Sequence, residues 1–285
     1  MMDKLASAHR VQRMCHAFQV SRSGYYKYIN KGKNSKRNKE NVFYSLEILN
    51  IWVTNRRLYG SPRITAALKK LGYKVNRKRV VRLMQINGIK ARRKKKYCST
   101  TNSKHNKSVA ENLLMRNFTA EGPNKIWLGD ITYLKTKEGR LYLAVVLDLY
   151  SRMPIGYNIQ TNMRTPLVLG ALQKAIEKRG NPTKQLIFHS DQGGQYASDE
   201  FKRMLSQYEV KQSMSRKGNC YDNAPMESFF HTLKTELMDL ENFNTRNEAE
   251  YAVINYIEKF YISNRLHSSL NYKSLKEFEL STSMA

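Results

Sequence analysis

Two apolar runs of this chain, each typical of a buried strand, contain an aspartate. Asp130 interrupts the run IWLGDITYL, and Asp191 ends the run QLIFHSD just before a Gly-Gly turn. A carboxylate in a strand core is costly unless it is paired or bound to a metal. A third acid, Glu227, lies near the start of an expected helix, NAPMESFFHTLKTEL. Two strand-borne aspartates and a helix-borne glutamate can line one pocket of oxygen ligands, which suits hard divalent cations and Mg²⁺ above all.

The positive charge of the chain is concentrated in its first hundred residues. The whole chain has a net charge of +27, and residues 1–100 hold 26 Lys and Arg against 3 Asp and Glu. The remaining residues hold 24 against 20. A basic front half of this kind favours a polyanionic partner such as duplex DNA, the alternative being only a solvated basic surface.

The cysteines and the chain start exclude several classes of protein. Cys15, Cys98 and Cys220 are far apart and form no Cys-x-x-Cys pair, which fits a reducing compartment rather than a disulfide scaffold. His9 and His16 do not have zinc-site spacing with Cys15. We find no apolar signal core and no stretch able to span a bilayer, so a cytoplasmic, nucleoid-associated protein without a membrane partner is expected.

The basic half is expected to be helical. Residues 10–29 are predicted to form two short helices with a turn near 19–21, a helix-turn-helix candidate. A long amphipathic helix at about 36–56 follows. Its apolar stripe, expected to pack against neighbouring helices, consists of Val42, Leu46, Leu49 and Val53.

A second helix-turn-helix is predicted between residues 61 and 88. Ser61 is the expected cap of the first helix, with Pro62 at its first position, and Gly72 ends it. Asn76 caps the second helix, which Gly88 terminates. Phosphate contact is the default role of the basic residues here, with base readout by one or two. The expected DNA-binding residues are Arg63, Arg77, Lys78, Arg79, Arg82, Lys90, Arg92, Arg93, Lys94, Lys95 and Lys96.

The second half of the chain has an α/β pattern. Three closely spaced strands, IWLGDITYL, LYLAVVLDLY and MPIGYNIQ, are followed by a helix at 165–179, the strand QLIFHSD, a helix at 198–208, the strand VKQSM and the Glu227 helix. A helix at about 247–262 and a tail close the chain. The expected divisions are a helix-turn-helix (1–32), a second helix-turn-helix domain (33–96), a basic and polar linker or mere tether (97–120), a catalytic core (121–240) and a C-terminal helix and tail (241–285).

Six stretches of the chain, in this order, resemble the OrfB-type transposases of the insertion-sequence three (IS-three) family and the DDE core of retroviral integrases. They are MCHAFQVSRSGYYKY, YGSPRITAALKKLGYKVNRKRVVRLM, IWLGDITYL, FHSDQGGQYAS, SRKGNCYDNAPMESFFHTLKTE and NRLHSSLNYKSLKEFE. The resemblance implies a multidomain chain with an all-α helix-turn-helix region and an α/β ribonuclease H-like core. It places Asp130 on the central first strand and Asp191 at the end of the fourth, adjacent and parallel, and packs the tail on the core. The integrases' zinc-binding front module is not expected.

The resemblance also implies the site. Asp130, Asp191 and Glu227 are the expected catalytic ligands of two Mg²⁺ ions, with Mn²⁺ as a substitute. The structural alternatives are an Asx-type turn at Asp191 and a helix-dipole contact at Glu227. Lys234 matches the family's cation two turns after the glutamate and is expected to hold a DNA phosphate. It shares a helix face with Glu227 and His231, and His231 is expected either to contact phosphate or water or to be half-buried.

The loop before the Glu227 helix and the remaining acids complete the predictions. Arg216, Lys217 and Asn223 are expected to contact DNA. Asp222 is expected in a mobile loop over the active site, and Asp148 as a turn cap. Asp199 and Glu200 are expected to open a helix behind Ser198.

The expected function is that of a DNA transposase that binds transposon ends and catalyses strand cleavage and strand transfer. Its expected partners are the terminal inverted repeats, target DNA, further copies of itself and an upstream OrfA-type product or fusion. The alternatives are a catalytically inactive DNA-binding regulator and a structure-directed nuclease. Inverted terminal repeats flanking the gene would support transposition over both.

Overall fold

The computed structural model describes residues 10–34, 36–92, 109–180, 185–216 and 220–283. The chain divides into two compact units, Met1–Ala91 and Arg92–Ala285, which we describe separately. Within the described ranges, no helix is both long and apolar enough to cross a membrane.

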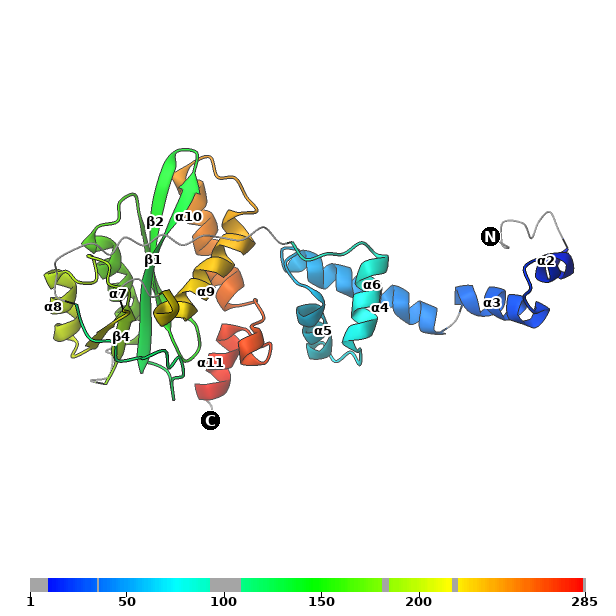
Figure 1. Cartoon of the computed structure of the whole chain (residues 1–285), viewed down its shortest axis with the longest axis horizontal. Helices are drawn as coiled ribbons and strands as arrows, with labels where there is room; N and C mark the ends of the chain where they lie inside the picture. Colours follow the sequence, from blue (N-terminus) through cyan, green and yellow to red (C-terminus); the bar gives the residue numbers. More distant parts are fainter. Residues whose placement is uncertain (1–9, 35, 93–108, 181–184, 217–219, 284–285) are drawn as a thin grey trace. The chain divides into compact units, whose positions relative to one another are not determined.

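The first unit is helical, as its sequence predicts (Figure 1). Its helices are α2 (Val11–Ala17), α3 (Arg22–Asn34), α4 (Lys36–Thr54), α5 (Ser61–Lys70) and α6 (Arg77–Ile86). The side chain of Asn76 accepts a hydrogen bond from the Arg79 backbone N–H at 2.8 Å, which confirms it as the cap of α6. The prediction for Ser61 was wrong by one residue, because Gly60 occupies the cap position and Ser61 is the first helical residue.

Helix α4 buries the face opposite to the one predicted. Val42 and Leu46 of the predicted stripe are 64% and 61% exposed, and Leu49 and Val53 are exposed as well. Ile48 and Ile51 are buried instead, where α4 packs against α5 and α6. The helix has two apolar faces, and periodicity alone does not decide which of them a neighbouring helix covers.

The second unit is built on a five-stranded mixed sheet. Its strands are β1 (Ile126–Thr136), β2 (Gly139–Asp148), β3 (Pro154–Gln160), β4 (Ile187–Ser190) and β5 (Lys211–Met214). Their order is β3-β2-β1-β4-β5, with β1, β2 and β3 antiparallel and β4 and β5 joined in parallel to β1. This is the ribonuclease H-like arrangement that was expected, with β1 at the centre of the sheet.

Helices cover both faces of this sheet (Figure 1). Helices α7 (Thr165–Arg179) and α8 (Asp199–Gln207) lie on one face, while α9 (Ala224–Leu233) and α10 (Arg246–Asn255) lie on the other. Close approach of α7 requires Gly156, where an added Cβ would lie 2.2 Å from the Ala171 carbonyl oxygen. Two helices end in π-helical turns, α9 in η2 (Lys234–Met238) and α10 in η3 (Tyr256–Ile262).

The C-terminal tail packs on the core, as expected. It comprises a short 3-10 turn, η4 (Ser268–Leu270), and helix α11 (Leu275–Ser283). Leu275 is fully buried, and Glu279 forms an ion pair with Arg179 of α7 and a hydrogen bond with the Ser151 hydroxyl. The last residues of the sequence therefore help to fix helix α7 against the sheet.

Candidate active site

The sheet brings Asp130 and Asp191 together. Leu128 of β1 pairs with His189 of β4 in the parallel ladder. The same register two residues further along sets Asp130 beside Asp191, which directly follows the end of β4. Residues two apart on a strand share one side of the sheet, so both carboxylates lie on the same side at the β1–β4 junction. Asp191 lies one residue beyond β4, so the parallel ladder brings the two aspartates to the same end of the β1–β4 pair.

Electrostatics place Glu227 in the same cluster. Asp130 is half-buried, and its Oδ1 accepts a hydrogen bond from the Ile131 N–H at 2.7 Å. Burial raises the pKa of Asp130 well above its usual range, and the charges of Asp191 and then Glu227 raise it further. Lys234 has the opposite effect on that pKa. A bound cation would offset the repulsion by which Asp191 and Glu227 disfavour the ionisation of Asp130.

The donor set of this cluster suits a hard divalent cation. All three side chains offer carboxylate oxygens, the ligands that Mg²⁺ and Mn²⁺ prefer. Asp191 is oriented by a hydrogen bond from the Gly193 N–H to its Oδ1, at 2.9 Å. Within the part of the chain that the structure describes, no three His, Cys, Asp or Glu side chains are close enough together to hold a metal ion. The chemistry of the residues fits a metal centre, and a bound cation would remove the repulsion that raises the pKa of Asp130.

Lys234 lies beside the carboxylates at the first residue of the π-helical turn. It is only 6% exposed, and its ammonium lies 4.8 Å from the centre of the Tyr133 ring. Burial lowers the pKa of Lys234 to about 8, against the opposing effect of the Asp130 charge. His231, one turn earlier, is exposed. The structure thus brings Lys234, and not His231, into the buried part of the site.

Tyr196 lies near enough to both aspartates to feel their charges, and no sequence pattern predicted this position. The side chain is buried, and its ring packs against Phe188 and Phe201. Burial raises the pKa of its hydroxyl well above the usual range, and the charges of Asp130 and Asp191 add to that rise. Its ring therefore lies in the aromatic part of the core near the two aspartates.

The loop before α9 differs from its prediction. Asp222 is fully buried in a 3-10 turn, η1 (Cys220–Asn223), whereas a mobile loop over the active site was expected. Its carboxylate accepts hydrogen bonds from the side chains of Asn112, Arg116 and Arg216, at 2.9 to 3.1 Å. Asn223 is 5% exposed and donates from Nδ2 to the Gly129 carbonyl at 3.2 Å. Sequence polarity suggested a solvated loop, whereas the polar groups are in fact bonded to one another.

Other acids behave as their positions predicted. Asp148 caps a turn, since its carboxylate accepts from the N–H groups of Tyr150 and Asn124. Ser198 caps α8 by accepting from the Phe201 N–H, with Asp199 and Glu200 in the first turn. Neither α8 acid is among the charges that shift the pKa of Asp130.

The basic residues expected to bind DNA are divided between exposed and bonded positions. Arg79 donates to Glu40 and Asn41 within the helical unit and lies over the Tyr44 ring. Arg63 is half-buried over the Tyr59 ring. The exposed members are Arg77, Lys78, Arg82, Lys90 and Arg92. The members outside the described residues are Arg93, Lys94, Lys95, Lys96 and Lys217.

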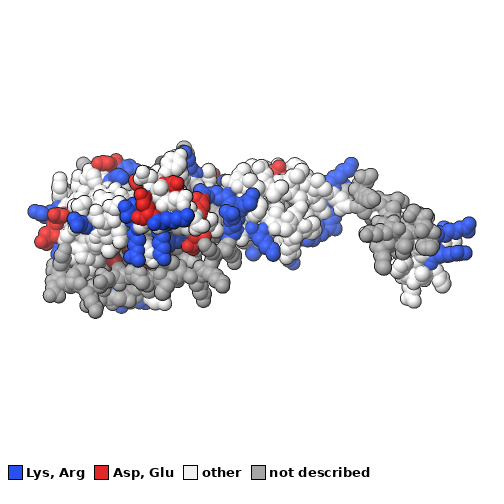
Figure 2. Space-filling model, turned by 90° about the horizontal axis from the view of Figure 1, so that it is seen from above, with Lys and Arg blue, Asp and Glu red and all other residues white. Residues whose placement is uncertain are grey.

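Charge is distributed differently over the two units. Figure 2 shows Lys and Arg with little Asp or Glu over the described part of the helical unit, and both signs over the larger unit. This agrees with the sequence, in which Glu40 and Glu47 are the acids of the described helical residues. The helical unit therefore offers the stronger attraction for a polyanion.

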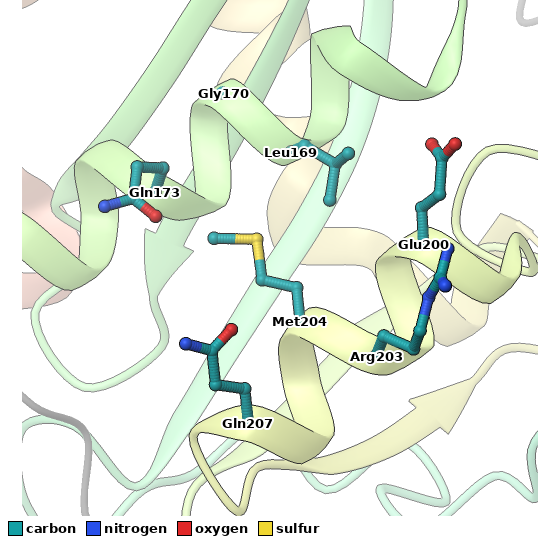
Figure 3. A pocket seen from close by; sticks show the side chains of 7 residues that line it. All are labelled: Leu169, Gly170, Gln173, Glu200, Arg203, Met204 and Gln207. Carbon is teal, nitrogen blue, oxygen red and sulfur yellow. The ribbon is translucent and has the colours of Figure 1, made fainter.

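A hollow on the surface between α7 and α8 is a different feature from the carboxylate cluster (Figure 3). Its lining combines Met204 and Leu169 with polar side chains from both helices. The expected catalytic residues do not contribute to this lining. We therefore assign the chemistry to the β1–β4 junction.

Known protein families match both units. Residues 39–97 match the family described as HTH-like domain, and residues 120–220 and 208–274 match two families described as Integrase core domain. The transposase InsF of insertion sequence IS3A from Escherichia coli K12 is 39% identical over 279 residues, covering 98% of this chain and 96% of that protein. An uncharacterized 31 kDa protein of insertion element IS600 from Shigella sonnei is 42% identical over 257 residues, covering 90% and 94%.

Two solved integrase structures are more distantly similar. The HTLV-2 integrase catalytic core domain in complex with magnesium is 22% identical, with a TM-score of 0.41, and covers 55% of this chain and 96% of that chain. The simian T-cell lymphotropic virus intasome, in complex with a PP2A regulatory subunit, is 21% identical, with a TM-score of 0.46, and covers 75% and 69%.

Proposed function

Because the chain belongs to the IS3 family of transposases, and is therefore an enzyme of DNA phosphoryl transfer, we propose that Asp130, Asp191 and Glu227 are its catalytic residues. The observation that carries this proposal is the register of β1 and β4, which sets Asp130 beside Asp191. The effect of the Asp191 and Glu227 charges on the pKa of Asp130 supports it. We propose that the three carboxylates hold two Mg²⁺ ions, with Mn²⁺ as a substitute.

The residues of the chain have distinct tasks in this reaction. When bound, the metal ions supply activation of the attacking water or 3′-hydroxyl and stabilisation of the leaving oxygen. The three carboxylates determine where the positive charge of the metal ions is located. Lys234 holds the phosphate next to the cleaved bond, since a buried ammonium attracts phosphate and is a poor metal ligand. The reaction needs no Ser, Tyr or Cys nucleophile.

We propose that the helical unit binds the terminal inverted repeats and that the larger unit acts on the bound end and on target DNA. The surplus of basic residues in the first hundred positions supports this division. Joining two transposon ends to one target calls for more than one active site, so we propose that the protein works as a homo-oligomer on DNA. An upstream OrfA-type product, or a fusion to it, is a further proposed partner, and the bacterial cytoplasm and nucleoid are the proposed location.

The test is to neutralise each acid singly. Asp130→Asn, Asp191→Asn and Glu227→Gln should each abolish Mg²⁺- and Mn²⁺-dependent nicking of a terminal-repeat duplex while leaving the affinity for that duplex unchanged. Glu200→Gln, which neutralises an exposed acid of α8, is the matched control and should nick like the unmodified protein. Near-normal nicking by any one of the three variants would remove that residue from the assigned set.

A further inference from the structure

Buried polar side chains fasten the start of helix α9 to both aspartate-bearing strands. Asn223 precedes Glu227 by four residues and donates from Nδ2 to the carbonyl of Gly129, the residue before Asp130, at 3.2 Å. The carbonyl of Asp222 lies 3.0 Å from Nε2 of His189, two residues before Asp191. Two consecutive residues before α9 are therefore each bonded to a different strand of the β1–β4 junction.

The Asp222 side chain keeps this segment in place. It is fully buried, and its two oxygens accept from Asn112, from Arg116 and from both the backbone and the guanidinium of Arg216. A buried carboxylate with that many donors is compensated for the loss of water. The peptide that carries Asp222 and Asn223 is thus also held by side chains outside β1 and β4.

The partners of His189 fix its orientation. Nδ1 lies 2.8 Å from the Ser213 hydroxyl, which also accepts from the Leu113 N–H. Nε2 faces the Asp222 carbonyl, which can only accept, so Nε2 carries the proton and Nδ1 accepts from Ser213. One arrangement of hydrogen bonds satisfies this buried ring, which joins β4 and β5 to the residue before Asn223.

Stability alone does not explain an asparagine at position 223. Its Oδ1 is buried and has no hydrogen-bond partner among the described residues, and its side chain does not cap α9. A buried acceptor without a partner destabilises the fold. The Nδ2–Gly129 bond is what the side chain provides in return, and it joins the backbone beside Asp130 to the helix that bears Glu227.

We propose that Asn223 is a positioning residue of the transposase, which fixes the start of helix α9 against β1 so that Glu227 stays beside the two aspartates and can join them in holding a metal ion. It acts through the backbone of Gly129 and not through contact with DNA, from which its burial separates it. Asp222 and His189 hold the same segment against β4. This inference rests on the proposed assignment of the three carboxylates as metal ligands.

Substitutions at position 223 of the full-length protein test this proposal. Asn223→Asp keeps the side-chain volume but replaces the donor with an acceptor facing the Gly129 carbonyl, and Asn223→Ala removes the side chain. Asn255→Ala is the matched control, because the Asn255 amide bonds locally to the Tyr251 carbonyl of α10. The measurements are Mn²⁺ affinity without DNA by electron paramagnetic resonance, duplex affinity in EDTA, nicking rate at saturating duplex, and thermal unfolding.

We expect both variants at position 223 to weaken Mn²⁺ binding and to slow nicking by about 10–100-fold, the usual effect of removing a group that orients metal ligands. Duplex affinity in EDTA should stay within about twofold, and excess Mn²⁺ should restore part of the nicking rate. Asn255→Ala should change none of these values. If Asn223→Ala does not fold, the isosteric Asn223→Asp decides the test.

Three results would overturn the inference. Duplex affinity that falls tenfold while Mn²⁺ affinity is unchanged would make Asn223 a DNA contact. Loss of the folded state in both variants would make it a structural residue. Unchanged Mn²⁺ affinity and nicking would give it no role. If Asp130→Asn still nicks and the unmodified protein binds no Mn²⁺, the proposed function fails instead, which separates the two failures.

Discussion

Gly129 has no room for a side chain, and this makes it a sensitive point beside Asp130, the proposed catalytic aspartate. A Cβ at this position would lie 2.4 Å from Cζ of Phe188, 2.9 Å from its Cε1 and 3.3 Å from Cε1 of Tyr196. Phe188 is fully buried, and its ring lies 5.2 Å from that of Phe201 and 6.1 Å from that of Tyr196. The ring cannot turn away without displacing another buried ring, so Gly129→Ala must strain the centre of the sheet.

The size of that strain follows from the atoms involved. Forcing one extra methyl into a well-packed core costs about 1–3 kcal/mol. For a unit of this size, each kcal/mol lowers the Tm by about 2–4 °C, so we expect a fall of about 2–12 °C. Gly122→Ala is the control, since a Cβ there meets nothing within 4 Å, and its effect should stay within about 0.5 kcal/mol.

The assay is urea denaturation of the full-length protein, followed by tryptophan fluorescence, together with thermal unfolding. The double variant Gly129→Ala/Phe188→Leu should lose less stability than the two single changes added together, because the smaller side chain removes the clash. The reasoning is refuted if Gly129→Ala unfolds like Gly122→Ala. It is also refuted if the two changes at Gly129 and Phe188 are simply additive.

Three further outcomes follow from the structure. On α4, Ile48→Ala should lower the free energy of unfolding by about 2–5 kcal/mol, whereas Leu46→Gln should change it by less than about 0.5 kcal/mol. Urea unfolding midpoints measure both effects, and the reverse order would mean that the predicted face is the buried one. Glu236 accepts from Arg265 at 2.7 and 2.8 Å in a nearly buried pair, so Arg265→Met should cost about 3–5 kcal/mol by the same measurement, and a loss below 1 kcal/mol would contradict this. Burial lowers the pKa of His189 from 6.5 to about 4. The contribution of the neutral ring to the free energy of unfolding should therefore be fully present above pH 6.5 and fall by up to about 3 kcal/mol as the pH drops towards 4. His189→Gln should remove this pH dependence, and its persistence in that variant would contradict the assignment.

The sequence predicted the core well where one physical rule governed the outcome. Apolar runs of strand length located β1, β2 and β3, and turn residues set their ends. The start of α6 was predicted from local capping chemistry, in which the side-chain oxygen of Asn76 accepts a backbone hydrogen bond. The placement of Asp130 beside Asp191 came from the resemblance, because periodicity within β1 and β4 does not reveal that the two strands are neighbours.

The errors arose where the outcome depends on residues distant in sequence. The side chains that bury Asp222 come from Asn112 and Arg116, more than a hundred positions away. A polar loop sequence carries no signal of such partners, so solvent was the default expectation. Asn223 was assigned to DNA for the same reason, and its bond to Gly129 is visible only once β1 and α9 are adjacent.

The π-helical turn at the end of α9 makes the spacing of this segment as important as its composition. A π turn holds one more residue than an α turn. Deleting a single residue between 234 and 238 would restore ordinary helix and leave the residues after it close to their present direction, because the extra residue is taken up within the turn. Converting the turn to ordinary helix without a deletion would instead rotate everything after it by about 100° relative to Glu227 and disturb the bonds of Glu236 with Arg265 and Tyr256. A single-residue deletion in these five positions should therefore be tolerated better than substitutions that close the turn to an α-helix.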